Sequence, residues 1–204
     1  NYFNSNSYNQ AKEIYYNLYT KNKIYKFYEK LLDCYINLNE LDNAERLCLK
    51  YYKLKKNNTS VLVDLGHIYN LKDQTKKSSK IFDEVLNIIQ NNFHRINLIA
   101  NRFKKYNYLE LTLKVYQISL QKTNRSNLRY HIARIYGEMG KLDLMYENYI
   151  RLIISNKEYL QNVKNIFKRT TTEDSESENN IILKEKLISI SLDLDNSNVF
   201  DILI

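Results

Sequence analysis

The sequence predicts an all-α fold, a right-handed α–α superhelix in which antiparallel helix pairs stack as a solenoid. Three observations predict it. The chain of 204 residues has no proline and only three glycines, whereas a sandwich or barrel requires many tight turns. Two separate groups of residues also recur about every 34 positions. Regular recurrence over that distance indicates helix pairs that stack on one another.

The first recurring group ends in an aromatic residue. Each member has a large aliphatic residue, usually a small residue next, and an aromatic three positions after that small residue. The aromatics are Tyr35, Tyr69, Phe103 and Tyr136, which lie 34, 34 and 33 positions apart. This spacing predicts the first helix of each repeating pair, which we call helix A.

The second group predicts the other helix of each pair, helix B. It combines a residue that is usually small with one that is usually aromatic four positions later, so both lie on one helical face. The first members are Ala11, Ala44, Ser78, Thr112 and Met145, which lie 33, 34, 34 and 33 positions apart. The second members are Tyr15, Cys48, Phe82, Tyr116 and Tyr149. A small residue at this position admits a neighbouring helix, and the large one fills the remaining space.

These two patterns resemble the tetratricopeptide repeat, which has a Leu-Gly/Ala-x-x-Tyr core in helix A and an Ala-x-x-x-Phe core in helix B. Leu65, Gly66, Tyr69 and Ala44 are the best matches. The resemblance covers residues 2–155 well and the remainder weakly. The chain departs from the family in lacking the proline that usually closes helix B.

The helices follow in order from this register. We expect A and B helices at 25–38 and 42–56, 59–71 and 75–91, 93–105 and 109–122, and 126–139 and 142–155. Asp42 and Glu45 resemble a capping box, and Asn58, Thr59 and Ser60 offer N-caps. Gly140 lies in an A-to-B turn, where a positive φ is often needed.

The register divides the chain into four regions. Residues 1–24 form the second half of a truncated repeat, with a helix B at 7–21. Residues 25–159 form four repeats. Residues 160–195 form a divergent repeat, with helices at 160–169 and 181–192 and an elongated, mobile acidic loop at 170–180. Residues 196–204 begin a further repeat. We therefore expect this chain to be a piece of a longer array.

The resemblance implies a binding function without catalysis. In the family, helix A lines a preformed concave groove that binds a peptide or a helix of another protein. Chaperone-binding members grip a carboxylate with Lys and Asn in the first repeat, where this chain has Glu29 and Asp33, so that subclass is disfavoured. The groove positions that we select are Glu29, Asp33, Ile36, Val63, His67, Asn70, Asn97, Asn101, Lys104, Tyr130 and Arg134.

The groove positions also predict the chemistry of the ligand. Their charge changes from acidic at Glu29 and Asp33 to basic at Lys104 and Arg134. We therefore expect a ligand segment of the opposite polarity. Asn97 and Asn101 have amides that donate and accept hydrogen bonds, which suits a peptide backbone. Solvated polar positions with no ligand are the equally simple alternative.

No motif predicts an enzyme, a metal site or a cofactor. His67, His94 and His131 fall in different repeats, and no H-E-x-x-H pattern or phosphate-binding glycine loop occurs. Cys34 and Cys48 are 14 positions apart and are expected to be buried small apolar residues. We therefore assign no catalytic residue, no metal ligand and no cofactor.

Two other functions remain open from the sequence. A helical-repeat RNA reader suits the net charge of +8 and the 19 tyrosines, but the tyrosines recur at predicted core positions, which disfavours it. Self-association through exposed repeat ends is the second alternative. No apolar run approaches the length of a membrane span. The composition suggests an AT-rich bacterial genome and is compatible with a cytoplasmic or periplasmic location.

Overall fold

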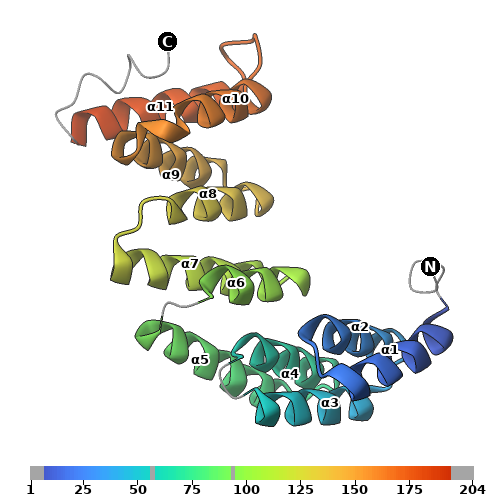
Figure 1. The fold of residues 1–204 in the computed structure, drawn as a ribbon. Coiled ribbons are helices and arrows are strands. Elements are labelled where there is room, and N and C mark those ends of the chain that lie inside the picture. The colour runs from blue at the N-terminus through green and yellow to red at the C-terminus, as the bar shows by residue number, and fades with distance from the viewer. Residues whose placement is uncertain (1–6, 56–57, 93–94, 194–204) are drawn as a thin grey trace. The chain divides into compact units, whose positions relative to one another are not determined.

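The computed structural model describes residues 7–55, 58–92 and 95–193, and their regular structure is helical throughout. The chain folds as two compact units, residues 1–91 and 92–204. Within each unit, helices that are neighbours in the chain run antiparallel and pack on one another up to residue 155, and the last two described helices both pack against the helix that ends there (Figure 1). The predicted all-α solenoid of helix pairs is confirmed. The predicted further repeat at 196–204 lies outside the described residues.

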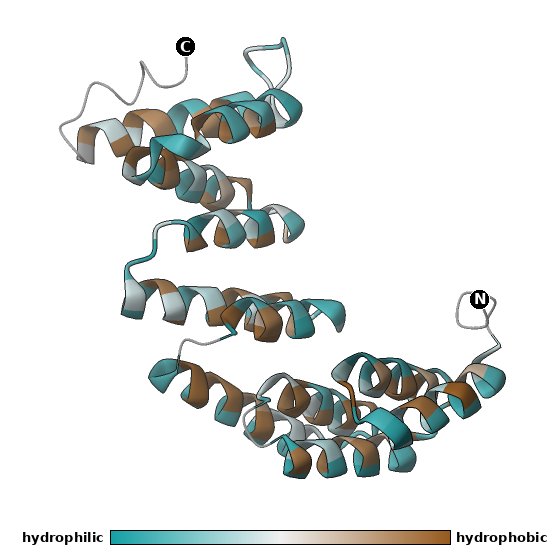
Figure 2. Cartoon of the chain, in the orientation of Figure 1, coloured by the Kyte–Doolittle hydropathy of each residue, from teal (hydrophilic) through white to brown (hydrophobic). Residues whose placement is uncertain are grey.

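The first unit contains five described helices. They are α1 (Tyr8–Asn22), α2 (Tyr25–Asn37), α3 (Leu41–Leu54), α4 (Ser60–Leu71) and α5 (Thr75–Asn91). In the repeat register α2 and α4 are A helices, and α1, α3 and α5 are B helices. Each helix packs against the next, so the polar and apolar residues that alternate around each turn (Figure 2) separate into exposed and buried faces.

The second unit continues the alternation. Its described helices are α6 (Ile96–Lys105), α7 (Leu109–Thr123), α8 (Leu128–Glu138), α9 (Leu142–Ser155), the short 3₁₀ helix η1 (Lys157–Tyr159), α10 (Leu160–Thr170) and α11 (Glu178–Asp193). α7 packs between α6 and α8, and α9 packs against α8, η1, α10 and α11. The A helices here are α6, α8 and α10.

Both recurring groups lie in the helical core. The first members of the helix B group, from Ala11 to Met145, are all at most 5% exposed. Among the helix A aromatics, Phe103 and Tyr136 are buried and Tyr35 and Tyr69 are half-buried. A Cβ built on Gly66 would lie 2.3 Å from Cε1 of the Phe82 ring, so the small residue of helix A lets helix B approach closely. The period therefore reflects packing between the two helices of a pair.

The turn between helix A and helix B has the same backbone geometry in all four pairs. Asn39, Asp73, Asn107 and Gly140 have φ values of 56°, 58°, 60° and 73°. One residue later, a backbone N–H donates to the carbonyl of the recurring aromatic, at 2.8 Å for Glu40 to Tyr35 and 2.9 Å for Lys141 to Tyr136. This is the bond that closes a Schellman turn, and the expected role of Gly140 is confirmed.

The predicted capping box at Asp42 and Glu45 is wrong. Helix α3 begins at Leu41, so Asp42 already lies in its first turn, and the N-cap residue Glu40 makes no side-chain cap bond. Both carboxylates instead accept from the Lys72 ammonium at the end of α4, at 2.7 and 2.6 Å. At the start of α4, Thr59 makes no side-chain cap bond either. The acidic residues therefore join neighbouring helix pairs.

The acidic loop is shorter than predicted. Helix α10 reaches Thr170 and α11 begins at Glu178, so only residues 171–177 separate them. The Asn180 side chain organises this segment, because its amide donates to the carbonyls of Thr172 and Asp174 at 2.8 and 2.7 Å. The expected elongated loop is therefore a short turn, which hydrogen bonds from the Asn180 side chain hold together.

A buried polar contact links the helix pairs of the first unit. Tyr28 of α2 and Asp64 of α4 are both 0% exposed, and the tyrosine hydroxyl donates to the carboxylate at 2.8 Å. The same hydroxyl lies 3.1 Å from Sγ of Cys48. Cys34 and Cys48 are both buried, as expected. No described helix is long and apolar enough to span a bilayer.

Candidate peptide-binding faces of the A helices

In the first unit, the selected positions differ widely in exposure. On α2, Glu29, Asp33 and Ile36 are half-buried. On α4, Asn70 is exposed and His67 is half-buried, but Val63 is 0% exposed. Val63 is therefore withdrawn from the candidate site. The reason is that α4 is buried along most of its length, from Ser60 to Gly66, so its midpoint cannot offer a groove position.

In the second unit, the selected positions are accessible. Asn97 and Asn101 of α6 and Arg134 of α8 are exposed, and Lys104 and Tyr130 are half-buried. Residues three or four apart lie on one side of a helix, so these residues share a face of α6 and of α8. The Lys104 ammonium forms an ion pair with Glu138 of α8, which joins the two A helices along this face.

Aromatic rings form the base of this face on α8. The Tyr130 ring packs edge-on against Tyr149 of α9, with 5.9 Å between centroids, and lies 5.9 Å from the Tyr159 ring of η1. His131 stacks on Tyr116 of α7 at 4.8 Å and an interplanar angle of 7°. Because the rings come from four elements, their positions are set by helix packing rather than by one flexible segment.

The charge of the face is dominated by Arg134. Burial raises the pKa of Tyr149 to about 12, and Tyr130 adds to the rise while Arg134 opposes it. Burial, with the Arg134 charge, lowers the pKa of His131. Both groups are therefore neutral near pH 7, which leaves the guanidinium as the charge of this aromatic cluster.

The sequence pointed to some of these residues and missed others. Tyr130 and Arg134 were selected from the repeat register, but Tyr159 and the stacking of His131 were not. Tyr159 lies in a 3₁₀ turn outside the register, so periodicity carried no signal for it. The stacking partner of His131 is Tyr116, which lies 15 positions earlier on another helix, so no short sequence pattern connected the two rings.

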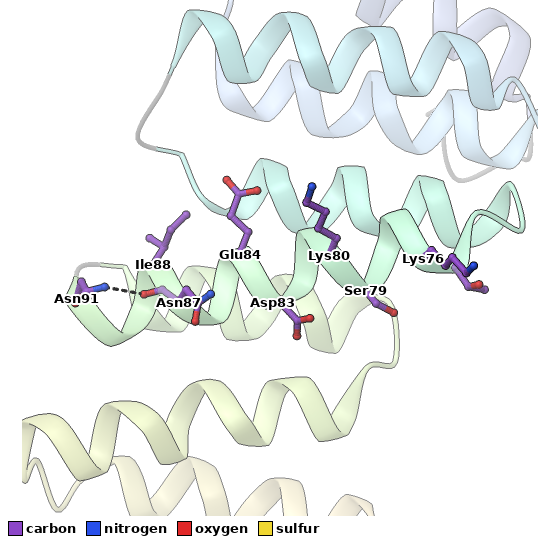
Figure 3. Close-up of a pocket in the computed structure, with 9 residues that line it drawn as sticks. Lys76, Ser79, Lys80, Asp83, Glu84, Asn87, Ile88 and Asn91 are labelled. Carbon is purple, nitrogen blue, oxygen red and sulfur yellow. Dashed lines mark hydrogen bonds between the residues drawn. The ribbon is translucent and has the colours of Figure 1, made fainter.

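A hollow of about 850 Å³ lies along the exposed face of α5 and was not predicted (Figure 3). Its lining includes Lys80, Asp83 and Glu84, with charges of both signs, and Asn91 donates to the Asn87 carbonyl at 3.2 Å. The hollow belongs to a B helix, so it is not one of the selected groove positions. Among the described residues, no cluster of three or more His, Cys, Asp or Glu side chains is arranged to hold a metal ion.

The fold itself defines the class, the all-α helical repeat proteins. The sequence matches no family model and no curated protein significantly. It is similar in structure to MamA, with a TM-score of 0.42 and 15% identity over 83% of this chain and 90% of that one.

Two further solved structures show the same degree of similarity. YrrB, described as a TPR protein with an unusual peptide-binding site, has a TM-score of 0.40 and 17% identity over 93% of this chain and 96% of its own. BtubC from P. vanneervenii has a TM-score of 0.41 and 13% identity over 93% and 90%. At these TM-scores the similarity supports no inference about the site or partner of this chain.

Proposed function

We propose that this chain is a non-enzymatic scaffold of the tetratricopeptide type, which binds a peptide or helix of another protein along the A-helix faces. The proposed architecture is four repeats in residues 25–159, with partial or divergent repeats on either side. The period of 33 or 34 residues and the repeated left-handed turn residues from Asn39 to Gly140 support this assignment.

The observation that carries the proposal is the accessible face of α6 and α8. Asn97 and Asn101 of α6 and Arg134 of α8 are exposed, and Arg134 lies one helical turn from the packed ring of Tyr130. Amides bind an extended backbone with both donor and acceptor, and aromatic rings add contact area at a small entropic cost. Because helix packing already holds these groups, a ligand would pay little for ordering the scaffold.

The proposal is tested by selecting binders from a displayed random peptide library with the purified chain. The selected peptides should bind the double variant Asn97→Ala/Asn101→Ala about 5- to 150-fold more weakly, since each of the two lost hydrogen bonds contributes roughly 0.5–1.5 kcal/mol. The matched control is Lys114→Ala/Lys122→Ala, which alters two exposed residues of the B helix α7. Equal loss in both variants, or no selected peptide, would count against the proposal.

Two companion measurements test the alternative partners, which are RNA and a second copy of this chain. Binding of a single-stranded RNA that weakens steeply between about 50 and 200 mM salt would indicate a nucleic-acid partner instead. An elution volume that depends on protein concentration would indicate self-association through the repeat ends. Neither result is expected if the A-helix faces act as a protein-binding surface.

A further inference from the structure

A small surface on α8 and η1 combines one cation with aromatic rings. We call it the α8 patch and define it as Tyr130, His131, Arg134 and Tyr159. Arg134 is exposed and the three rings are half-buried, so each has an accessible part. The patch lies on the A-helix face described above, and the inference below therefore rests on the proposed function.

Arg134 has no carboxylate partner within the described part of the chain. The other charges nearby already have partners: Lys104 pairs with Glu138, and Arg129 donates to the side-chain Oδ1 of Asn148 at 3.2 Å. The rings nearest Arg134 supply no negative charge, since burial favours the neutral form of both Tyr116 and Tyr149. The patch thus presents an uncompensated guanidinium.

The rings beside Arg134 offer an apolar surface with fixed geometry. Tyr130 contacts Tyr149, Tyr159 and His131, each at 5.9 Å between centroids. A ring held by three neighbours loses little rotamer freedom when a ligand contacts it. An aromatic side chain of a ligand would find edge-to-face partners here, which add about 0.5–1.5 kcal/mol beyond area burial.

The exposed amides of α6 extend the patch on one side. Asn101 lies three residues before Lys104, and Arg134 lies four residues before Glu138, so the Lys104–Glu138 ion pair places both on the joined side of α6 and α8. Donors and acceptors for a backbone thus lie beside Arg134 on α6, while the Tyr130 ring lies one turn before Arg134 on α8 and contacts the Tyr159 ring. A ligand backbone would therefore continue in both directions past the guanidinium.

We propose that the α8 patch recognises an extended peptide segment in which an internal Asp or Glu side chain lies next to an aromatic residue. The carboxylate accepts two parallel hydrogen bonds from the Arg134 guanidinium, which is the geometry that this side chain favours. The aromatic side chain packs on Tyr130 and Tyr159. The backbone on the far side bonds to the Asn101 amide.

The test measures fluorescence anisotropy of labelled decapeptides with the whole chain. One set contains an internal Glu followed by Tyr at varied spacing, and matched sets replace Glu by Gln or Lys, or Tyr by Ala, with free and amidated C-termini. Glu–Tyr peptides should bind about tenfold more tightly than their Gln counterparts, because a charge-assisted bond is roughly twice as strong as a neutral one. C-terminal amidation should leave their affinity unchanged.

Variants locate the effect. Arg134→Gln should abolish the preference for Glu over Gln while Gln peptides bind as before, and Arg134→Lys should restore part of it because Lys keeps the charge but not the fork. Arg125→Gln is the control, since it removes an exposed arginine outside the patch. Circular dichroism melting curves should be the same for all three variants.

The outcomes separate this inference from the proposed function. If peptides bind without preferring Glu, or if Arg134→Gln keeps the preference, the α8 patch assignment is wrong and the scaffold proposal stands. A requirement for a free C-terminus also overturns it. If no peptide of any set binds and the displayed library yields none, both proposals fail.

Discussion

At the scale of single residues, the three glycines serve different physical purposes. A Cβ on Gly66 would meet the Phe82 ring at 2.3 Å, whereas one on Gly137 would meet the Met145 sulfur at 2.9 Å. Phe82 is a buried, flat ring, and Met145 is a flexible chain that moves at small cost. Gly140 meets nothing but has a φ of +73°. Only Gly66 is required by close packing.

We predict that Gly66→Ala lowers the free energy of unfolding by about 1–3 kcal/mol, the usual cost of overpacking a core. Gly137→Ala is the matched control, since it makes the same change inside a helix and should be neutral or slightly stabilising because alanine favours helices. Urea denaturation followed by circular dichroism measures both. A Gly66→Ala protein as stable as the control would show that Phe82 moves aside freely.

At the scale of elements, the four A-to-B turns share one backbone geometry, and ion pairs join three of the four turn regions to the preceding helix pair. Lys12 of α1 pairs with Glu40, Asp42 and Glu45 of α3 pair with Lys72, and Glu110 of α7 pairs with Lys141. The partner in the turn region is acidic in the first case and basic in the other two. These pairs are partly exposed, so they add orientation more than stability.

The left-handed turn residue should control stability more than the ion pairs. Asn107 has a φ of 60°, which glycine adopts freely and a β-branched residue does not. We predict that Asn107→Gly changes the free energy of unfolding by less than about 1 kcal/mol and that Asn107→Val lowers it by about 1–2 kcal/mol. Thermal denaturation measures the difference.

The reciprocal change provides the control for the turn. Gly140→Asn places at the fourth turn the residue that the third turn already contains, so it should be nearly neutral. If Asn107→Val were equally neutral, the turn would have to adopt another conformation, and the shared geometry would carry no energetic meaning.

At the scale of the whole molecule, both units contain buried or half-buried tyrosines. Burial raises the pKa of phenol groups in each unit, with the largest resolved value, about 12, at Tyr149, which is 2% exposed. The tyrosines affected are Tyr19, Tyr35, Tyr51, Tyr52, Tyr69, Tyr116 and Tyr149. The thiol of Cys34 is affected in the same direction, to about 11, mainly through burial.

These shifts predict a loss of stability at alkaline pH. Between pH 10 and 12 the folded chain retains protons that the unfolded chain has released, so the free energy of unfolding falls as pH rises. Below the ordinary phenol pKa of 10.0, these tyrosines do not affect the free energy of unfolding. Above it, Tyr149 alone lowers the free energy of unfolding by about 2–3 kcal/mol at most. Urea denaturation at a series of pH values measures the slope.

Tyr149→Phe should make the free energy of unfolding fall less steeply with pH between pH 10 and 12, by the equivalent of up to one bound proton, because phenylalanine has no group to ionise. A tyrosinate absorbance titration completed near pH 10 in the folded protein would show that the phenols are accessible and would contradict the prediction.

Much of the fold followed from local patterns. The boundaries of the helices were predictable because the recurring motifs and the turn residues are short patterns that can be read along the chain at intervals of 33 or 34 residues. The first helix of the fourth pair, expected at 126–139, spans Leu128–Glu138. The functions of Asp42 and Glu45 were not predictable, because their partner Lys72 lies 30 and 27 positions away and is reached only after the pairs stack.

The candidate site was predictable only in part. The repeat register selects positions on a helix face, and five of its selections in the second unit are accessible. The same register placed Val63 in the groove, where it is fully buried. Register assigns an average face to each helix, whereas burial depends on how closely the neighbouring helices of that particular pair approach.

The sequence by itself determined the helix pairs, their turns and the packing period, because these depend on contacts between residues within about one repeat. Only the tertiary structure decided which groove positions stay open, how Asn180 shortens the acidic loop, and that Arg134 stands among rings from α7, α8, α9 and η1. Those outcomes depend on the distances between stacked elements, and local sequence patterns do not encode such distances.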